Sequence, residues 1–286
     1  MWHHGRMAAD ILKPSDMRAC SPRGVFIWLF FALQALTACS VKEDRAACPC
    51  YASVFVNEFL KAGFSGAMLS FSSDRLVYRE DIRLVEYEDW PYVASLERRT
   101  NRASLIAGLE KMHVRGDSLL VPYGLASDPV WLYSERFFCD GDDYTIKARP
   151  HKQYCRLEIV LKGLSAEERT ACSFRVKAGF CGIDLYSRRA LEGGFCAEAE
   201  RGLDGSFSLL LPRQGDGGIM LEASCGPQWG EESFMIDVGA RLRAAGYDWT
   251  LEDLRDVSVT VDYAKAEISL RILDWNPDDF FKNIII

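Results

Sequence analysis

The strongest constraint on the fold is a period-two alternation of apolar and polar residues near the end of the chain. Residues 257–263 place Val, Val, Val and Tyr on one face of a strand and Ser, Thr and Asp on the other. Residues 266–272 repeat the pattern with Ala, Ile, Leu and Ile, but the phase has slipped by one position. Such alternation predicts half-buried strands. The slip indicates either a tight hairpin near Ala264 and Lys265 or a β-bulge.

Short segments with strand character recur along the rest of the chain and are separated by turns. Residues 155–161 alternate apolar and polar positions and end at Gly163. We predict a mainly all-β fold built of β-sandwiches, because many short strands with a turn about every 8 to 12 residues are typical of that architecture. The other predicted strands are residues 51–59, 75–87, 118–125, 130–133, 174–186, 207–211 and 219–223.

The chain is long enough for two domains. It has 286 residues, of which 49% are apolar and 26% charged, and a domain has on average about 150 residues. The segment 144–152 is the best place for a boundary. We therefore predict an N-terminal sandwich over residues 51–148 and a C-terminal sandwich over residues 149–286.

One or two short helices are expected in the second sandwich. Val238 and Leu242 lie on one helical face, between Asp237, which can cap the first turn, and Gly246, which can end the helix. A second short turn is predicted over residues 250–254, capped by Thr250 and Asp253.

The first 38 residues have the anatomy of a secretory signal peptide. Residues 25–38 are apolar apart from two positions and are shorter than the about 20 residues that a bilayer-spanning helix needs. Basic residues precede this segment, and no acidic residue lies between Met17 and Cys39. We expect residues 1–38 to be removed, with Met1 and Met17 as alternative starts of translation. A buried core helix is the structural alternative.

The end of this segment resembles a bacterial lipobox. Leu36, Thr37 and Ala38 precede Cys39. Small residues before the cut suit a signal peptidase, and the Cys39 thiol can carry a diacylglycerol. We predict cleavage between Ala38 and Cys39, followed by attachment through acyl chains to a membrane that the polypeptide does not cross. Cleavage removes four Lys/Arg and two Asp/Glu and leaves 248 residues with a net charge of -9.

Residues 39–50 form a predicted tether at the start of the mature chain. Its Lys-Glu-Asp run is either a solvated spacer or a signal for export to the outer face of the outer membrane. Eight further cysteines remain, and an even number in an exported protein favours disulfide pairing without specifying the pairs. These candidate disulfide cysteines are Cys48, Cys50, Cys139, Cys155, Cys172, Cys181, Cys196 and Cys225.

The sequence offers little for catalysis or metal binding. The G-x-S-x-G, P-loop, H-E-x-x-H and Rossmann patterns are absent. Cys48 and Cys50 lack the further ligands of a zinc site, since only His113 and His151 remain in the mature chain. Residues 140–143 lack the spacing of a calcium loop and favour a turn. The acidic balance argues against a nucleic-acid partner. We expect no enzyme activity, no metal, no cofactor besides the lipid, and no small-molecule substrate.

Three segments together carry a resemblance to a known family. The first is the start of the mature chain, 39–50, and the second is 155–163 with the later Gly182–Tyr186. The third and most specific comprises Gly-Tyr-Asp-Trp-Thr at 246–250, Glu-Asp-Leu at 252–254, Asp-Val-Ser-Val at 256–259, Asp-Tyr at 262–263 and Asp-Trp at 274–275. Together these residues resemble the FimB-type anchor subunits of Bacteroidetes type V fimbriae. Nothing between Asn57 and Gly116 contributes to the resemblance.

The resemblance implies two tandem transthyretin-like β-sandwiches and a lipoprotein that fixes a fimbria to the cell outer membrane and influences its length. Its partners would be fimbrial shaft subunits, joined by strand exchange, which is a form of β-augmentation. The family's lipid-carrying residue corresponds to Cys39. The apolar end of the chain, residues 280–286, is a candidate donor strand, with packing on its own domain as the alternative.

Two functions of other classes stay open at this point. The seven Trp residues allow a glycan-binding surface lipoprotein that stacks sugars on exposed indole rings. A lipidated hydrolase would require a cleft with converging polar groups.

Overall fold

The structure is a computed structural model, and it describes residues 48–215, 218–225, 233–265 and 267–273. The predicted signal peptide, the cleavage site at Ala38 and Cys39, most of the tether and the candidate donor strand lie outside the described residues. Within the described ranges the chain is mostly strand with a few short helices, which confirms the mainly all-β prediction. None of the helices in this part of the chain has the length and apolar character of a membrane span.

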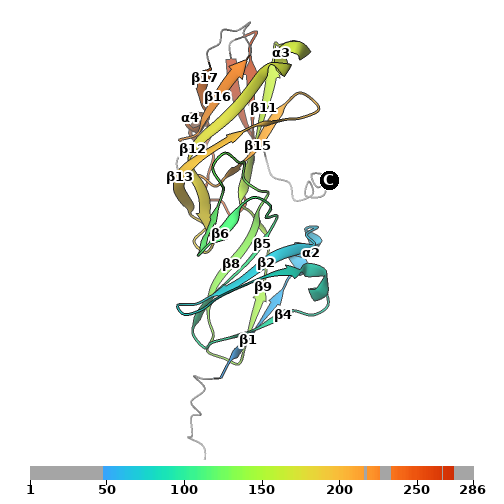
Figure 1. The fold of residues 1–286 in the computed structure, drawn as a ribbon, viewed down its shortest axis with the longest axis vertical. Coiled ribbons are helices and arrows are strands. Elements are labelled where there is room, and N and C mark those ends of the chain that lie inside the picture. Colours follow the sequence, from blue (N-terminus) through green and yellow to red (C-terminus); the bar gives the residue numbers. More distant parts are fainter. Residues whose placement is uncertain (1–47, 216–217, 226–232, 266, 274–286) are drawn as a thin grey trace, which may run out of the picture. The chain divides into compact units, whose positions relative to one another are not determined.

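The N-terminal sandwich has two sheets (Figure 1). In the first, β1 lies between an antiparallel β4 and a parallel β9. In the second, the strand order is β10-β8-β5-β2-β3. The first sheet consists of β1 (Cys50–Phe55), β4 (Tyr92–Leu96) and β9 (Asp143–Lys147), and the second of β2 (Gly66–Ser72), β3 (Val77–Arg83), β5 (Thr100–Ala107), β8 (Trp131–Phe138) and β10 (His151–Lys152). The helical segments are α2 (Asn57–Lys61) and the 3-10 turn η1 (Leu84–Tyr87).

The C-terminal sandwich also has two sheets. Here β11 lies between an antiparallel β15 and a parallel β18, in the order β14-β15-β11-β18-β19. The other sheet runs β17-β16-β12-β7-β6, and β13 pairs with β12. The strands are β6 (His113–Arg115), β7 (Ser118–Leu120), β11 (Tyr154–Lys162), β12 (Cys172–Asp184), β13 (Ala190–Glu198), β14 (Glu200–Arg201), β15 (Phe207–Pro212), β16 (Met220–Cys225), β17 (Phe234–Asp237), β18 (Asp256–Asp262) and β19 (Glu267–Leu273), with helices α3 (Ala166–Thr170) and α4 (Val238–Ala244).

Each sandwich buries its own apolar cluster. Phe59 of α2 and Leu69 of β2 are buried in the N-terminal cluster. Phe174 of β12 and Leu157 of β11 are buried in the C-terminal cluster. Burial of such side chains is the main stabilising contribution in a fold of this kind.

The hairpin β6–β7 precedes the predicted domain boundary in sequence but joins the C-terminal sheet. Leu119 of β7 lies opposite Ile183 of β12 and is fully buried in the C-terminal cluster. The boundary near residue 148 stays a prediction, and the pairing adds that residues 113–120 belong to a sheet of the second sandwich.

Two of the local predictions are confirmed. Strands β18 and β19 form an antiparallel hairpin whose register ends at the pair Asp262 and Glu267, so the phase slip marks a tight turn. Helix α4 begins after Asp237, whose Oδ1 accepts the N–H of Ala240 at 2.7 Å, and Gly246 follows it with a φ of 74°.

One other local prediction is wrong, and another is confirmed except for the residues that hold the turn. Residues 57–59 belong to α2 rather than to a strand, because the chain turns at Val56 and the helix carries Phe59 into the core. Residues 250–253 form a turn and a bend, as predicted, and the second sandwich has two short helices, α3 and α4. Asp248 holds the turn by accepting the backbone N–H of Thr250 at 2.7 Å, while Asp253 accepts the N–H of Lys152 instead.

Candidate functional site

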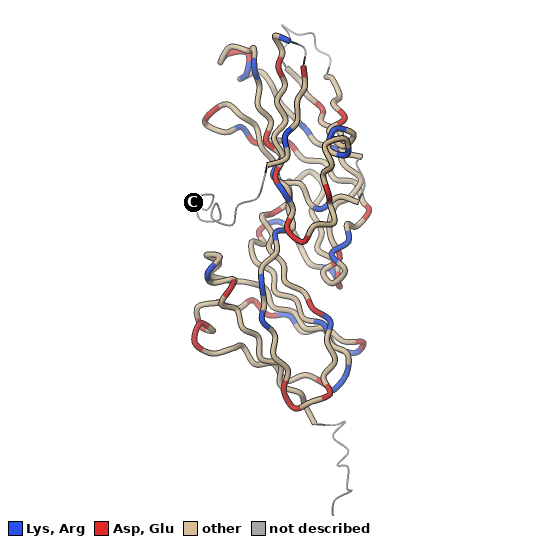
Figure 2. Tube along the Cα trace, turned by 180° about the vertical axis from the view of Figure 1, so that it is seen from behind, with Lys and Arg blue, Asp and Glu red and all other residues tan. Residues whose placement is uncertain are grey.

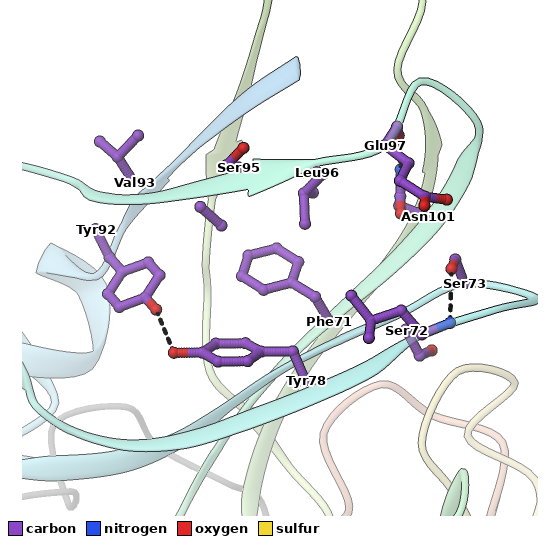
Figure 3. A pocket seen from close by; sticks show the side chains of 12 residues that line it. Phe71, Ser72, Ser73, Tyr78, Tyr92, Val93, Ser95, Leu96, Glu97 and Asn101 are labelled. Atoms are coloured by element: carbon purple, nitrogen blue, oxygen red, sulfur yellow. Dashed lines mark hydrogen bonds between the residues drawn. The ribbon is translucent and has the colours of Figure 1, made fainter. Parts of the chain in front are cut away.

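Strands β3 and β4 are the outer strands of the two sheets at one corner of the N-terminal sandwich. Within the described residues β3 pairs only with β2 and β4 only with β1, so no backbone pairing closes this corner. A groove of about 290 Å³ lies there, which we call the β3–β4 groove (Figure 3). It is lined by Phe71, Ser72, Ser73, Leu76, Tyr78, Tyr92, Val93, Ala94, Ser95, Leu96, Glu97 and Asn101.

The backbone of β4 presents polar groups to this groove at alternate residues. The N–H of Tyr51 in β1 donates to the carbonyl of Asp142 beside β9 at 2.8 Å, so Tyr51 directs its polar groups away from β4. Opposed residues in an antiparallel pair alternate between exchanging two hydrogen bonds and exchanging none. Ser95 lies opposite Tyr51, and Val93 lies opposite Ser53. It follows that Val93 and Ser95 direct their N–H and C=O groups away from β1, toward the groove.

The side chains of the groove are largely apolar. Phe71 and Leu96 are buried at its floor, whereas Leu76 and Val93 are more than half exposed at its rim. A segment seated here would remove this apolar surface from water, which is favourable by about 25 cal/mol per Å². The groove therefore offers both an unpaired strand edge and apolar contacts.

A cluster of hydroxyl groups spans one end of the groove. The hydroxyls of Tyr78 in β3 and Tyr92 in β4 lie 3.1 Å apart, and Figure 3 shows the two rings meeting across the groove. Both hydroxyls donate to the carboxylate of Glu80, the one from Tyr92 at 2.7 Å. These hydrogen bonds lower the pKa of Glu80, and the one from Tyr78 has the larger effect. We call these three residues the tyrosine latch.

The other end of the groove is fixed by the turn that joins β4 to β5. Arg99 pairs with Asp74 at 2.5 Å and with Glu97 at 2.6 Å. Asn101 donates from Nδ2 to the carbonyls of Glu97 at 2.9 Å and Arg99 at 3.0 Å. The hydrogen bond from Arg99 is the largest cause that lowers the pKa of Asp74. The groove is thus held at both ends by side chains while its strand edges stay unpaired.

The corresponding corner of the C-terminal sandwich is closed. Strand β13 is followed after one residue by β14, which pairs with β15 across the corner. Arg201 in β14 donates to the carbonyls of Arg169 and Thr170, both at 2.8 Å, and its guanidinium lies 5.0 Å from the ring centroid of Phe207. The chain itself therefore pairs with the first two residues, Phe207 and Ser208, of the edge whose counterpart is open in the first sandwich.

The first part of the most specific segment of the family resemblance forms a loop before β18, in which Tyr247, Trp249 and Leu254 are buried. Arg213 is 4% exposed and donates to the carbonyls of Trp249 and Leu251, the latter at 2.8 Å. Burial lowers the pKa of Arg213 to about 10. Tyr247 donates from its hydroxyl to the carbonyl of Arg255 at 2.6 Å. These residues hold the loop in place, so their role in the structure is to stabilise the fold.

Two of the eight candidate disulfide cysteines are joined in the structure. Cys172 in β12 and Cys225 in β16 lie opposite each other and form a disulfide. The remaining six carry thiols here, and for them pairing stays a prediction: Cys48, Cys50, Cys139, Cys155, Cys181 and Cys196. In the described ranges no group of three or more His, Cys, Asp or Glu side chains is placed to hold a metal ion.

The sequence did not reveal the groove, because it lies in the part of the chain that contributes nothing to the resemblance. A signal was nevertheless present in residues 75–93. Apolar side chains there alternate poorly with charged ones, and Leu76, Val85, Trp90 and Val93 are exposed in the structure. Acidic residues are interspersed with basic ones along the described trace, so charge does not mark the site either (Figure 2).

The described fold places the chain among tandem β-sandwich proteins. Solved structures with a similar fold include three from Bacteroidetes. The fimbrial anchor protein Mfa2 from Porphyromonas gingivalis aligns with a TM-score of 0.53 and 10% identity, over 80% of this chain and 98% of that one. A candidate adhesin from Bacteroides thetaiotaomicron aligns with a TM-score of 0.53 and 12% identity, over 81% and 98% of the two chains. A candidate polysaccharide-binding protein from the same organism reaches 0.56 at 9% identity, over 80% and 96%.

These likenesses show that the chain shares the tandem β-sandwich fold of a fimbrial anchor protein, as the resemblance implied. No family model matches the sequence. No curated protein matches it either.

Proposed function

We propose that the chain is a non-enzymatic lipoprotein of the outer membrane that anchors a surface fimbria and takes part in its assembly or length control. Acyl chains on Cys39 would hold it on the membrane, exposed at the cell surface. The β3–β4 groove would accept an extended segment of a fimbrial shaft subunit. Two observations support this: the lipobox in the sequence, and the fold that the chain shares with a fimbrial anchor protein.

The open edge of β4 is the observation that carries the proposal. Five residues of β4 line the groove, and those at positions 93 and 95 direct backbone polar groups into it. A strand added there would form main-chain hydrogen bonds with β4 while alternate side chains enter the groove over Phe71 and Leu96. Main-chain pairing gives affinity, and the side-chain contacts give specificity for the subunit.

A matched pair of substitutions at Ser95 tests this interaction. Ser95→Pro removes one N–H that faces the groove, and proline is tolerated on an edge strand, so the fold should persist. Ser95→Ala keeps that N–H and serves as the control. We expect the proline variant to recover at least about tenfold less shaft subunit in pull-down, which corresponds to about 1.4 kcal/mol. Equal recovery by the two variants would contradict strand pairing at β4.

Photocrosslinking in cells locates the partner on the surface. A photoreactive residue in place of Val93, at the groove rim, should capture a fimbrial shaft subunit. The same residue in place of Leu203, exposed on a turn of the second sandwich, should not. Capture from both positions, or from Leu203 alone, would place the contact elsewhere.

The anchoring step is tested separately at Cys39. In Cys39→Ala the acceptor for the lipid is lost, so the protein should leave the membrane fraction and fimbriae should detach from cells. The groove is unchanged in this variant, so pull-down of the shaft subunit should be retained. Fimbriae that stay attached to cells would show that the chain is not their anchor.

A glycan-binding role is the second candidate, and one exposed tryptophan favours it. Of the described Trp residues, Trp131 and Trp249 are buried, while Trp90 is 78% exposed in the link between η1 and β4. A glycan array decides between the roles: an anchor should bind no glycan, whereas a lectin should bind one and lose it on Trp90→Ala.

A further inference from the structure

Three cysteines gather where the chain enters the N-terminal sandwich. Cys50 begins β1 and is fully buried, Cys139 follows β8 and is 1% exposed, and Cys48 is exposed. Cys50 and Cys139 belong to the same buried cluster, and the neighbouring Cys50 contributes to a raised pKa of Cys139. The thiol of Cys139 also contacts Nδ2 of Asn101 at 3.4 Å. The Cys48-Pro49-Cys50 motif therefore has a third cysteine beside it from a distant part of the sequence.

One arginine holds the two chain segments that carry these thiols. Arg98 donates from Nε to the carbonyl of Cys48 at 3.1 Å and from a terminal nitrogen to the carbonyl of Asp140 at 2.9 Å. Its side chain is only 10% exposed and also pairs with Asp142. Arg98 thus ties the backbone next to Cys50 to the backbone next to Cys139, as a cross-link between the two thiols requires.

We propose that Cys50 and Cys139 form a disulfide in the exported protein, which links the start of β1 to the end of β8. This cross-link rests on the hydrogen bonds that hold residues 48–51 beside residues 140–142 and does not depend on the fimbrial role. It closes a loop that contains strands β2 to β8, including both strands of the β3–β4 groove. Cys48 stays outside the cross-link as an exposed thiol.

The reaction is a thiol–disulfide exchange with a disulfide R–S–S–R, such as that of an exported oxidoreductase. The Cys50 thiolate attacks one sulfur of R–S–S–R, and the first R–S⁻ leaves and takes up a proton. The Cys139 thiolate then attacks Sγ of Cys50 in the mixed disulfide, and the second R–S⁻ leaves as R–SH. Two cysteine thiols are oxidised by two electrons, and one disulfide R–S–S–R is reduced to two thiols.

Burial sets the time at which this exchange takes place. Burial is the largest cause that raises the pKa of Cys139 to about 12, and the neighbouring Cys50 adds to it. The folded state therefore holds little of the reactive thiolate. Exchange therefore occurs before β1 docks, and the finished disulfide is afterwards shielded from reductants. If the chain is the anchor proposed above, a pull on Cys39 reaches β1 first, and the cross-link would keep β1 in its sheet.

Peptide mapping of the native protein tests the proposal directly. Mature protein recovered from the cell envelope is denatured in iodoacetamide without reductant and digested with trypsin. Cys48 and Cys50 then lie in peptide 46–61, and Cys139 lies in peptide 137–147. We expect these two peptides as one joined species that disappears on reduction. Recovery of both as separate alkylated peptides would overturn the proposal.

An internal control is present in the same digest. Cys155 is as deeply buried as Cys50, and burial raises its pKa to about 12, but its polar contacts are Tyr247 and the carbonyl of Arg156 rather than a thiol. We expect Cys155 to be alkylated on a linear peptide. A cross-link from the Cys155 peptide to peptide 46–61 or peptide 137–147 in place of the joined species would overturn the pairing of Cys50 with Cys139.

Two variants assign the bond within peptide 46–61. In Cys48→Ser, which changes an exposed residue, the joined species should persist in full. In Cys50→Ser it should be lost. Loss in Cys48→Ser, or persistence in Cys50→Ser, would assign the bond to Cys48 and overturn the pairing of Cys50. The map of the native protein decides the question even if Cys50→Ser fails to fold.

Discussion

The two sandwiches share the strand arrangement around β1 and β11, and they differ at the corner beside β4 and β15. In the first, β1 lies between antiparallel β4 and parallel β9, and in the second, β11 lies between antiparallel β15 and parallel β18. In the first, the chain leaves β3 through η1 before it returns as β4, whereas only Ala199 separates β13 from β14. The length of one connection therefore decides whether a strand edge is covered by the chain or left for a partner.

The comparison extends to the opposite side of each sandwich. In the second, α4 lies beside the outer strands β17 and β19, and Arg241 donates to the carbonyl of Ile268 at 3.1 Å. In the first, the rings of Phe137 and Tyr144 stack with centroids 4.4 Å apart. Side-chain contacts thus cross this side in both sandwiches, whereas at the β3–β4 corner and its counterpart only the second sandwich has an added strand, β14.

The largest expected effect tests whether the two cores are independent. Phe59→Ala removes a fully buried ring from the first cluster, and Phe174→Ala removes one from the second. Each should cost about 3–5 kcal/mol in the free energy of unfolding. Hydrogen exchange should accelerate in β1, β2 and β5 for Phe59→Ala, and in β11, β12 and β15 for Phe174→Ala. Equal acceleration in both sandwiches would mean that they unfold as one unit.

A smaller effect is expected from the buried loop of the second sandwich. Arg213→Met leaves the carbonyls of Trp249 and Leu251 without their buried donor, which should cost about 2–4 kcal/mol. Urea denaturation measures this cost. Arg243→Met, at an exposed position of α4, is the matched control and should stay within about 0.5 kcal/mol. A similar loss in both variants would remove the structural role assigned to Arg213.

The closed corner can be loosened by a single substitution. Arg201→Ala removes the hydrogen bonds from β14 to Arg169 and Thr170 and should cost about 1–2 kcal/mol. Arg175→Ala breaks an exposed ion pair with Glu198 and should cost less than Arg201→Ala, because water screens exposed ion pairs. If pull-down of a shaft subunit rises in Arg201→Ala, the closed corner has become a second acceptor. If β14 exchanges no faster than in wild type, side-chain fixation does not close the corner.

The smallest effect concerns the tyrosine latch. Tyr92→Phe removes one donor to Glu80 and should lower the melting temperature by no more than about 2–3 °C. The pKa of Glu80 is lowered in the folded state, so its stabilising contribution is present above its ordinary value of 4.5 and is lost as pH falls through the lower folded value. Melting temperature should therefore fall less between pH 5 and about pH 3 in Tyr92→Phe than in wild type. Parallel pH profiles would show that the latch contributes nothing.

Sequence patterns predicted the elements whose cues are local. The β18–β19 hairpin follows from strict alternation, and α4 follows from Asp237 and Gly246 at its ends. The extended prediction failed at residues 57–59, because Phe59 is buried from a helix and its apolar neighbours fit either period. Local patterns describe one strand at a time and cannot say which strand lies at an edge.

The groove could not be predicted for the same reason. An open corner depends on which strands are absent from a sheet edge, and that is decided by pairings between residues far apart in sequence. Tyr78, Glu80 and Tyr92 come together only because β3 and β4 belong to different sheets that meet at this corner. Cys50 and Cys139 likewise reach the same cluster through long-range contacts, namely the pairing of β1 with β9 and the hydrogen bonds of Arg98.

The hairpin β6–β7 has a consequence for how such proteins diverge. Because Leu119 fills the second core from a segment that precedes the last strands of the first sandwich, the two halves are interleaved along the chain. Recombination at residue 148 between two relatives would deliver a hairpin suited to the sheet of one parent into the sheet of the other. Exchange of whole halves is therefore disfavoured, and variation in partner choice is expected to accumulate by substitution within one lineage, at the open corner of the first sandwich.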